Sequence, residues 1–235
     1  MDQKTSQAII KQTQANFNMI SPHFLETRRF LWQDITAFMP EIRLKTKILD
    51  VACGSGRFAQ LAKNPNNYVG VDFAKNLLKA AKKNYPQARF FQGGLTTKSV
   101  WEKISQAGPF DLVFCIAFLP HLPLPGQHQD ILNHIYRVLQ PGGQLVLSVW
   151  NLWQPRFLIQ HLKQIPKKIT TGSLSSLWVP YKISDGQQVI RVASRYHYAF
   201  FPGQVEKLLK QAGFKLLKKQ TQGKNLIFLG QKPEK

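Results

Sequence analysis

Short apolar runs alternate with helical segments between residues 47 and 150, and this alternation restricts the possible fold more than any other feature. The runs typical of strands are residues 47–52, 67–72, 88–93, 110–118 and 143–150. Helical periodicity marks the segments between them, namely 56–63, 74–84, 97–106 and 127–139. Strands that alternate with helices pair in parallel through right-handed crossovers. We therefore expect an α/β fold built on a doubly wound, mostly parallel sheet.

Helical patterns precede this core. A polar helix is predicted over residues 5–18, and helical spacing continues from residue 19 to Pro40, which should end it. Within the core, "LQPGGQL" at residues 139–145 predicts a turn before the fifth strand.

A looser segment, residues 151–198, follows the fifth strand and is rich in Trp, Pro and basic residues, which suggests a lid-like insertion. Residues 203–212 predict a helix, with Gly213 at its C-cap. Two further apolar runs, 214–220 and 225–231, predict an antiparallel C-terminal hairpin at the sheet edge. The expected sheet is therefore seven-stranded.

The charge balance points to a polyanionic partner. Lys and Arg number 32 against 12 Asp and Glu, a formal charge of +20. Residues 1–150 hold 17 basic and 9 acidic residues, whereas residues 151–235 hold 15 and 3, so the second part is more strongly basic. Nucleic acid is the favoured partner, because each phosphate contact releases counterions. An anionic membrane surface is the rival, and lysines that only solvate the surface are the third interpretation.

Cysteine content and hydropathy argue against disulfide-rich, zinc-binding and membrane-spanning classes of protein. With two cysteines, the chain's thiols cannot form a disulfide framework or a four-ligand zinc site, and we expect no metal. There is no uninterrupted apolar run of about 18 residues, and the N-terminus is polar. We therefore expect a cytoplasmic protein without membrane insertion.

The stretch "LDVACGSGRF", residues 49–58, combines a carboxylate with a glycine turn. In a doubly wound sheet, ligands bind beyond the carboxyl ends of the strands. Gly54 and Gly56 allow close backbone approach there, and Asp72 follows the second strand, about where a carboxylate accepts hydrogen bonds from ribose hydroxyls. Two neighbouring strand ends therefore predict a nucleoside site.

Asp50 discriminates between two kinds of nucleoside ligand. Its charge repels a pyrophosphate but attracts an ammonium or a sulfonium, and the attraction is stronger in a partly desolvated cleft. Asp50 therefore favours S-adenosylmethionine over a dinucleotide. The alternative is a helix N-cap or turn role for Asp50. For Asp72, an N-cap role is compatible with ribose binding.

These motifs resemble those of class I S-adenosylmethionine-dependent methyltransferases. The similarity covers about residues 46–150 and rests on "ILDVACGSG", Asp72, "FDLVFCIAFLPHL" and "LQPGGQLVLSVW". It implies a Rossmann-like methyltransferase fold with S-adenosyl-L-methionine as cofactor. The implied cofactor-binding residues are Asp50, Ala52, Gly54, Gly56, Asp72, Phe73, Cys115 and Ile116. Gly94 stands where many members have an Asp near the adenine.

Three segments outside this core resemble the tRNA wobble-uridine carboxymethyl methyltransferases. They are "ISPHFLETRRFLWQDITAFM" (20–39), "LWVPYK" (177–182) and "SRYHYAFFPGQVEKL" (194–208). The resemblance implies methylation of a carboxymethyl-type modification on the anticodon wobble uridine of tRNA, and a possible small activating subunit. The aromatic and histidine order differs here, as Tyr196, His197, Tyr198.

Candidate residues for the acceptor side follow from this resemblance and from side-chain chemistry. The candidate catalytic residues are Arg195, His121 and His197. The candidate substrate-binding residues are Arg28, Arg29, Trp150, Asn151, Lys182 and Tyr196. Each has a structural alternative: a surface salt bridge for Arg195, a solvated face for Arg28 and Arg29, a structural role for the histidines and core packing for the aromatic residues.

We expect a single methyltransferase domain over residues 1–235. Its parts are an N-terminal helical segment (1–40), a cofactor-binding core (41–150), a substrate-side insertion (151–200) and a C-terminal helix and strand pair (201–235). Two other functions remain open at this point. One is a small-molecule O- or C-methyltransferase of the quinone or natural-product kind, and the other is a non-catalytic RNA-binding subunit.

Overall fold

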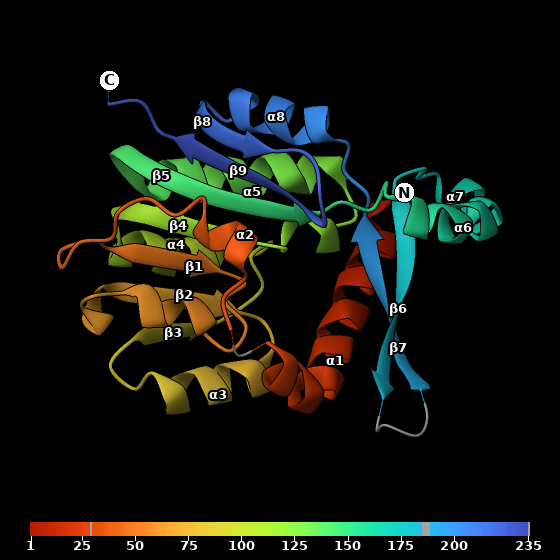
Figure 1. Cartoon of the computed structure of the whole chain (residues 1–235), viewed down its shortest axis with the longest axis horizontal. Helices are drawn as coiled ribbons and strands as arrows, with labels where there is room; N and C mark the ends of the chain where they lie inside the picture. The colour runs from red at the N-terminus through yellow and green to blue at the C-terminus, as the bar shows by residue number, and fades with distance from the viewer. Residues whose placement is uncertain (29, 185–188, 235) are drawn as a thin grey trace.

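The computed structural model describes residues 1–28, 30–184 and 189–234 and contains the expected doubly wound sheet (Figure 1). Its strands are β1 (Ile48–Val51), β2 (Tyr68–Asp72), β3 (Arg89–Gln92), β4 (Phe110–Ile116), β5 (Leu139–Trp150), β8 (Lys215–Gln220) and β9 (Asn225–Gln231). The strand order is β3-β2-β1-β4-β5-β9-β8. The first five strands pair in parallel, and β9 is antiparallel to both β5 and β8. The seven-stranded sheet and its C-terminal hairpin are therefore confirmed.

Helices cover both faces of the sheet. One face packs against α4 (Lys98–Ala107), α5 (Pro125–Val138) and α8 (Pro202–Gln211). The other packs against α2 (Gln33–Thr36), the 3₁₀ helix η1 (Arg57–Leu61) and α3 (Lys75–Asn84). Two further 3₁₀ turns are η2 (Pro65–Asn67) and η3 (Leu119–His121). Three layers result, with the sheet in the middle (Figure 1).

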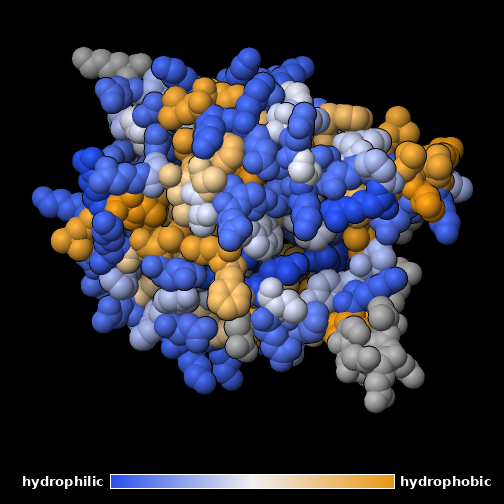
Figure 2. Space-filling model, in the orientation of Figure 1, coloured by the Kyte–Doolittle hydropathy of each residue, from blue (hydrophilic) through white to orange (hydrophobic). Residues whose placement is uncertain are grey.

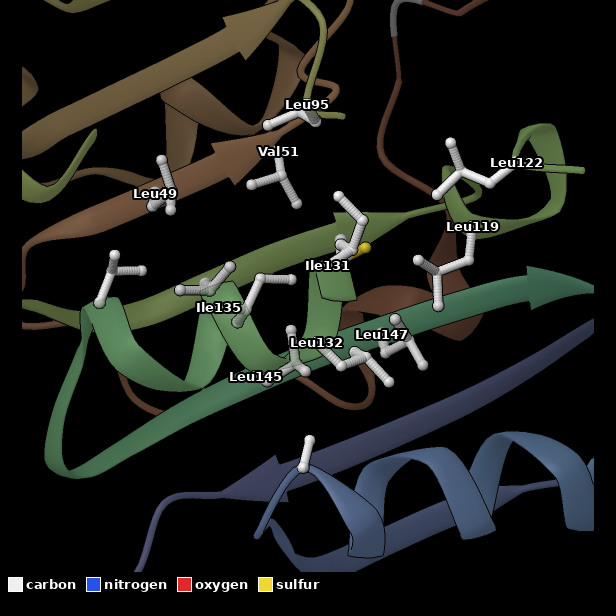
Figure 3. Packing of buried hydrophobic residues seen from close by; sticks show 14 of the residues in the cluster. Leu49, Val51, Leu95, Leu119, Leu122, Ile131, Leu132, Ile135, Leu145 and Leu147 are labelled. Carbon is white, nitrogen blue, oxygen red and sulfur yellow. The ribbon is translucent and has the colours of Figure 1, made fainter. Parts of the chain in front are cut away.

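Alternation along each strand divides the core between the two faces. On β1, Leu49 and Val51 pack with Ile135 and Leu147 on the α5 side (Figure 3), whereas Ile48 packs on the α3 side. Asp50 shares the α3 side with Ile48, because successive side chains point to opposite faces. The sequence thus places a carboxylate inside an otherwise apolar layer.

The N-terminal segment differs from the expectation. Instead of helical structure over 5–18 and from 19 to Pro40, one helix, α1, runs from Gln3 to Thr27 through Pro22, and the short α2 follows. Pro22 has no N–H to donate to the carbonyl of Asn18. That carbonyl instead accepts hydrogen bonds from Ser21 Oγ at 2.8 Å and Asn76 Nδ2 at 3.2 Å. The helix tolerates its proline because these side chains replace the missing donor.

Two local expectations in the core are also corrected. The segment 56–63 forms a 3₁₀ helix rather than an α-helix, and Pro65 follows it closely. The expected turn at 139–145 lies inside β5, since Leu139 already pairs with Phe110 and the register shifts before Leu112 pairs with Gln144. Gly142, with φ +77°, belongs to this irregular stretch.

The insertion after β5 forms a separate unit beside the sheet. It contains α6 (Pro155–Lys163), α7 (Ile165–Thr171) and a two-stranded antiparallel sheet of β6 (Ser176–Ser184) and β7 (Val189–Tyr198). Its hairpin contacts α1, where His23 Nδ1 lies 2.7 Å from the Tyr181 hydroxyl and Asn16 Nδ2 donates to the Ser194 carbonyl at 2.9 Å. Figure 1 shows α1 between this hairpin and the sheet.

Gly70, in the middle of β2, provides a test of this packing. A Cβ at Gly70 would lie 2.7 Å from Phe90 Cδ1 and 2.9 Å from Cys53 Sγ. We expect Gly70→Ala to lower the free energy of unfolding by about 1–3 kcal/mol, the usual cost of overpacking a core. Urea denaturation measures this change.

Gly203→Ala is the matched control, because a Cβ at Gly203 meets nothing within 4 Å. Its free energy of unfolding should stay the same or rise slightly. Equal stability of the two variants would contradict the packing described for β2.

Candidate functional site

A cleft opens at the carboxyl ends of β1, β2 and β4. The N-terminal helix α1 covers one side, and Arg195 of β7 reaches it from the insertion. Its walls include the aromatic residues Phe17, Phe24, Trp32, Phe58, Phe73, Phe118 and Trp150. The cleft therefore lies where a doubly wound sheet places its ligand.

Asp72 holds together the two backbone turns at the floor of the cleft. Its Oδ2 accepts the Gly54 N–H at 2.8 Å, and its Oδ1 accepts the Ala74 N–H at 2.7 Å. Ala74, not Asp72, is the N-cap of α3. Burial raises the pKa of Asp72 to about 6, although the backbone donors oppose this shift. A carboxylate has about four acceptor positions, so two stay available to hydroxyl groups of a ligand.

Asp50 is buried beside the same turn. It lies inside β1 and accepts a hydrogen bond from the Tyr68 hydroxyl at 2.5 Å, so it is neither an N-cap nor a turn residue. Burial raises its pKa to about 7, while the Tyr68 hydrogen bond and the charge of Arg57 act in the opposite direction. Neither Asp50 nor Asp72 forms a salt bridge with any described residue. A cationic ligand would stabilise both carboxylates in their ionised form.

The loop between these carboxylates has a left-handed backbone. Gly54 and Gly56 have φ values of +56° and +71°, and Ala52, a residue with a Cβ, has +59°. Ala52 and Gly54 line the cleft. Gly56 does not, and a Cβ there would approach Phe90 to 3.0 Å. The glycine at position 56 is therefore explained by backbone conformation and packing, whereas Ala52 and Gly54 face the cleft.

Arg195 of β7 lines the cleft. It is 5% exposed, and its guanidinium lies 4.8 Å from the ring centre of Tyr181 and 5.2 Å from that of Trp150. It forms no salt bridge within the part of the chain that the structure describes, and its Nε has no hydrogen-bond partner. Burial lowers its pKa to about 10, so it stays charged at neutral pH. A buried cation without an anion favours an anionic ligand.

Two histidines pack against this arginine. The rings of His121 and His197 are 4.7 Å apart, and Trp150 stacks on His197 at 4.9 Å. Burial lowers the pKa of His121 to about 4 and that of His197 well below its usual value, so both are neutral at pH 7. His121 lines the cleft, whereas His197 lies behind it with Nε2 unpartnered.

Several predicted residues lie elsewhere. Cys115 is fully buried in the core, and Tyr196 is buried with its hydroxyl 3.2 Å from Ser176 Oγ. Asn151 caps a turn by accepting the Trp153 N–H, and Lys182 is exposed on the hairpin. Arg29 lies outside the described residues. In contrast, the cleft brings together Asp50, Ala52, Gly54, Asp72, Phe73, Ile116, His121, Arg195, Arg28 and Trp150.

The sequence analysis missed part of the wall. Phe17 and Phe24 come from α1, two turns apart on one helix face, a spacing that could have indicated their common orientation. Arg57 lies directly after the glycine turn and stacks over Trp32 at 4.2 Å. Gly94, which stands where the resemblance leads us to expect an Asp, lines the cleft.

Comparison with known proteins identifies the core. Residues 48–143 match the family described as a methyltransferase domain. A protein named an uncharacterized methyltransferase from Synechocystis is 37% identical over 116 residues, which cover 46% of this chain and 52% of that protein. The chain thus spans about half the length of this relative.

Two further relatives have more specific names. A tRNA (carboxymethyluridine(34)-5-O)-methyltransferase of Schizosaccharomyces pombe is 23% identical over 86% of this chain and 87% of its own length. A ubiquinone biosynthesis O-methyltransferase of Psychrobacter arcticus is 28% identical over 72% of this chain and 58% of its own length.

Solved structures support the fold. A S-adenosylmethionine-dependent methyltransferase from Methanosarcina mazei superposes with a TM-score of 0.64, at 20% identity, over 87% of this chain and 99% of that one. The domain match, the sheet order and the carboxylate and glycine floor of the cleft agree with one another. Residues 48–143 are therefore a methyltransferase domain, in a chain that has the fold of S-adenosylmethionine-dependent methyltransferases.

Proposed function

We propose that this protein transfers a methyl group from S-adenosylmethionine to a carboxylate, specifically that of a carboxymethyl group on the wobble uridine of tRNA. The observation that carries the proposal is Arg195, a buried guanidinium that lines the cleft and has no acidic partner among the described residues. A carboxylate acceptor would supply the missing anion.

The floor of the cleft fits the cofactor. Asp50 would attract its ammonium, and the free lone pairs of Asp72 would accept its ribose hydroxyls. The aromatic walls, including Phe73 and Phe118, would cover its adenine and exclude water. When bound, S-adenosylmethionine supplies a methyl group on a cationic sulfur, which leaves as a neutral thioether.

The residues of the cleft would align and shield the acceptor rather than remove a proton from it. A carboxylate is already ionised at neutral pH, so no general base is required. Arg195 would hold one carboxylate oxygen, while the other attacks the methyl carbon and forms the ester. His121 and His197, both neutral, would contribute shape and a low dielectric around this ion pair.

The choice of tRNA is supported by two further findings. The S. pombe relative with the tRNA name matches over most of both chains. The chain's charge of +20, concentrated in its second part, suits a polyanionic substrate.

A small apolar acceptor is the second candidate. The cleft is walled mainly by aromatic and aliphatic side chains, and the Psychrobacter relative is named for ubiquinone biosynthesis. This candidate shares the whole cofactor floor and leaves the unpaired charge of Arg195 unexplained.

Cofactor affinity should depend on pH through the two buried carboxylates. Their pKa values, about 7 for Asp50 and about 6 for Asp72, mean that both become neutral as the pH falls below 6. Calorimetry should show affinity rising between pH 5.5 and 7.5, because only the ionised carboxylates attract the cationic ligand. The gain should be about 1–3 kcal/mol.

Asp50→Asn should flatten most of this pH dependence. His121, whose pKa burial lowers to about 4, stays neutral across the range and should not contribute. Glu102→Gln, an exposed change on α4, should keep the full dependence. A pH-independent affinity in the unmodified protein would contradict a charge-based cofactor site.

Arg195→Gln should impair turnover with carboxymethyl-bearing tRNA far more than cofactor binding. Loss of a charged hydrogen bond to the acceptor should lower kcat/KM by about ten- to a hundredfold. The cofactor dissociation constant should change less than about threefold, since Arg195 forms no salt bridge with Asp50 or Asp72. Steady-state kinetics and calorimetry measure the two quantities.

Arg195→Lys should retain part of the activity, because lysine keeps the charge but lacks the planar guanidinium that can donate two parallel hydrogen bonds to a carboxylate. Lys103→Gln on α4 should behave like the unmodified protein. If Arg195→Gln weakened cofactor binding instead, Arg195 would belong to the cofactor site.

The acceptor itself can be identified by mass spectrometry of nucleosides from the tRNA of cells lacking the gene. We expect the carboxymethyl nucleoside to accumulate and its methyl ester to disappear. Expression of the unmodified protein should restore the ester, and Arg195→Gln should restore much less. An unchanged nucleoside profile together with an altered quinone profile would support the second candidate.

A further inference from the structure

The first part of the insertion exposes aliphatic side chains in an unusual density. We define the aliphatic patch by six residues that are between 47% and 78% exposed: Leu158, Ile159, Leu162, Ile165, Ile169 and Leu174. All six lie on α6, on α7 or directly after it. Exposed aliphatic residues are normal singly, whereas a contiguous group indicates an interaction surface.

On α6, aliphatic side chains face outward, which is the reverse of the usual pattern for a surface helix. Its inner face carries His161, which is buried, and Phe157, which packs against Leu152, Leu177 and Val179. The outer face carries Leu158, Ile159 and Leu162. A helix on the surface of a soluble domain normally turns such residues inward.

The same reversal occurs on α7. Lys168 is 6% exposed, and its Nζ lies 2.7 Å from Nδ1 of the buried His161. Ile165 and Ile169, one turn apart, are exposed. The helix therefore buries a lysine and presents isoleucines, an arrangement that internal packing does not require.

Two exposed basic residues flank the part of the patch on α6. Arg156 and Lys163, at the two ends of α6, are both exposed. In the sequence, residues 151–184 contain five basic residues and no acidic one. An outer surface that combines aliphatic side chains with basic flanks complements an anionic lipid surface in both apolar and electrostatic terms.

We propose that α6 and α7 dock this protein peripherally on an anionic membrane surface, with the aliphatic patch at the boundary between headgroups and acyl chains. Figures 1 and 2 show α6 and α7 at the edge of the molecule, with apolar side chains gathered there. A protruding tip can enter a bilayer surface. RNA is the less suitable ligand, because exposed Leu and Ile offer phosphates neither charge nor hydrogen bonds.

This docking is peripheral. Among the helices in the described part of the chain, none is long and apolar enough to cross a bilayer. The proposal is independent of the acceptor, since the patch lies outside the residues that line the cleft.

Vesicle co-sedimentation of the full chain tests the proposal. The unmodified protein should bind vesicles of phosphatidylcholine with phosphatidylglycerol and bind pure phosphatidylcholine vesicles much more weakly. Ile159→Gln with Leu162→Gln should weaken binding to the anionic vesicles by about tenfold or more, because two aliphatic side chains no longer leave water. Arg156→Gln with Lys163→Gln should weaken it similarly and reduce its salt dependence.

The matched control is Leu44→Gln with Leu217→Gln, two exposed leucines outside the patch, which should bind like the unmodified protein. Circular dichroism and cofactor affinity should be the same for all variants, since none touches the cleft. No binding of the unmodified protein to anionic vesicles, or equal binding by the Ile159 and Leu162 variant, would overturn the proposal. Light scattering that shows a dimer, lost in that variant without vesicle binding, would assign the patch to a second copy of the chain instead.

Discussion

The architecture of the cleft depends on a pair of carboxylates buried at neighbouring strand ends. A carboxylate buried at such a place must find donors, and Asp72 finds them in the backbone N–H groups of Gly54 and Ala74. These two hydrogen bonds tie the loop after β1 to the start of α3, so the ligand-facing backbone is fixed before any ligand binds. Asp50 uses Tyr68 in the same way from within β1. Desolvation leaves both groups with raised pKa values, and a cation can lower them again.

Buried charges of both signs line the cleft. The floor carries the carboxylates of Asp50 and Asp72, whereas Arg195 supplies a buried positive charge from β7. A reaction between a cationic donor and an anionic acceptor would match these charges, because the carboxylates would attract the donor and the guanidinium would attract the acceptor. Both charges would also be neutralised as the ester and the thioether form. The neutral state of His121 and His197 leaves this electrostatic pattern undisturbed.

The sequence was sufficient for the parts of the structure that local patterns determine. Alternating periodicity predicts the sheet and its hairpin, and the spacing of Asp50, Gly54 and Asp72 predicts the floor of the cleft. Contacts between distant segments were not predictable in this way. The wall formed by Phe17 depends on how α1 crosses the sheet, and the burial of Cys115 depends on which face of β4 meets α5. Periodicity fixes the alternation along an element but not the partner that covers it.

The insertion contains several features that lie outside the matched methyltransferase domain. The family match ends at residue 143, so Arg195, His197 and the aliphatic patch all lie beyond it. The inner side of the insertion contributes the guanidinium of Arg195 to the cleft, and its outer side presents Leu and Ile to the surroundings. The hydrogen bond between His23 and Tyr181 joins this unit to α1, the other wall of the cleft. Because the same segment borders the cleft and carries the patch, a surface that binds the patch would also orient the entrance to the cleft.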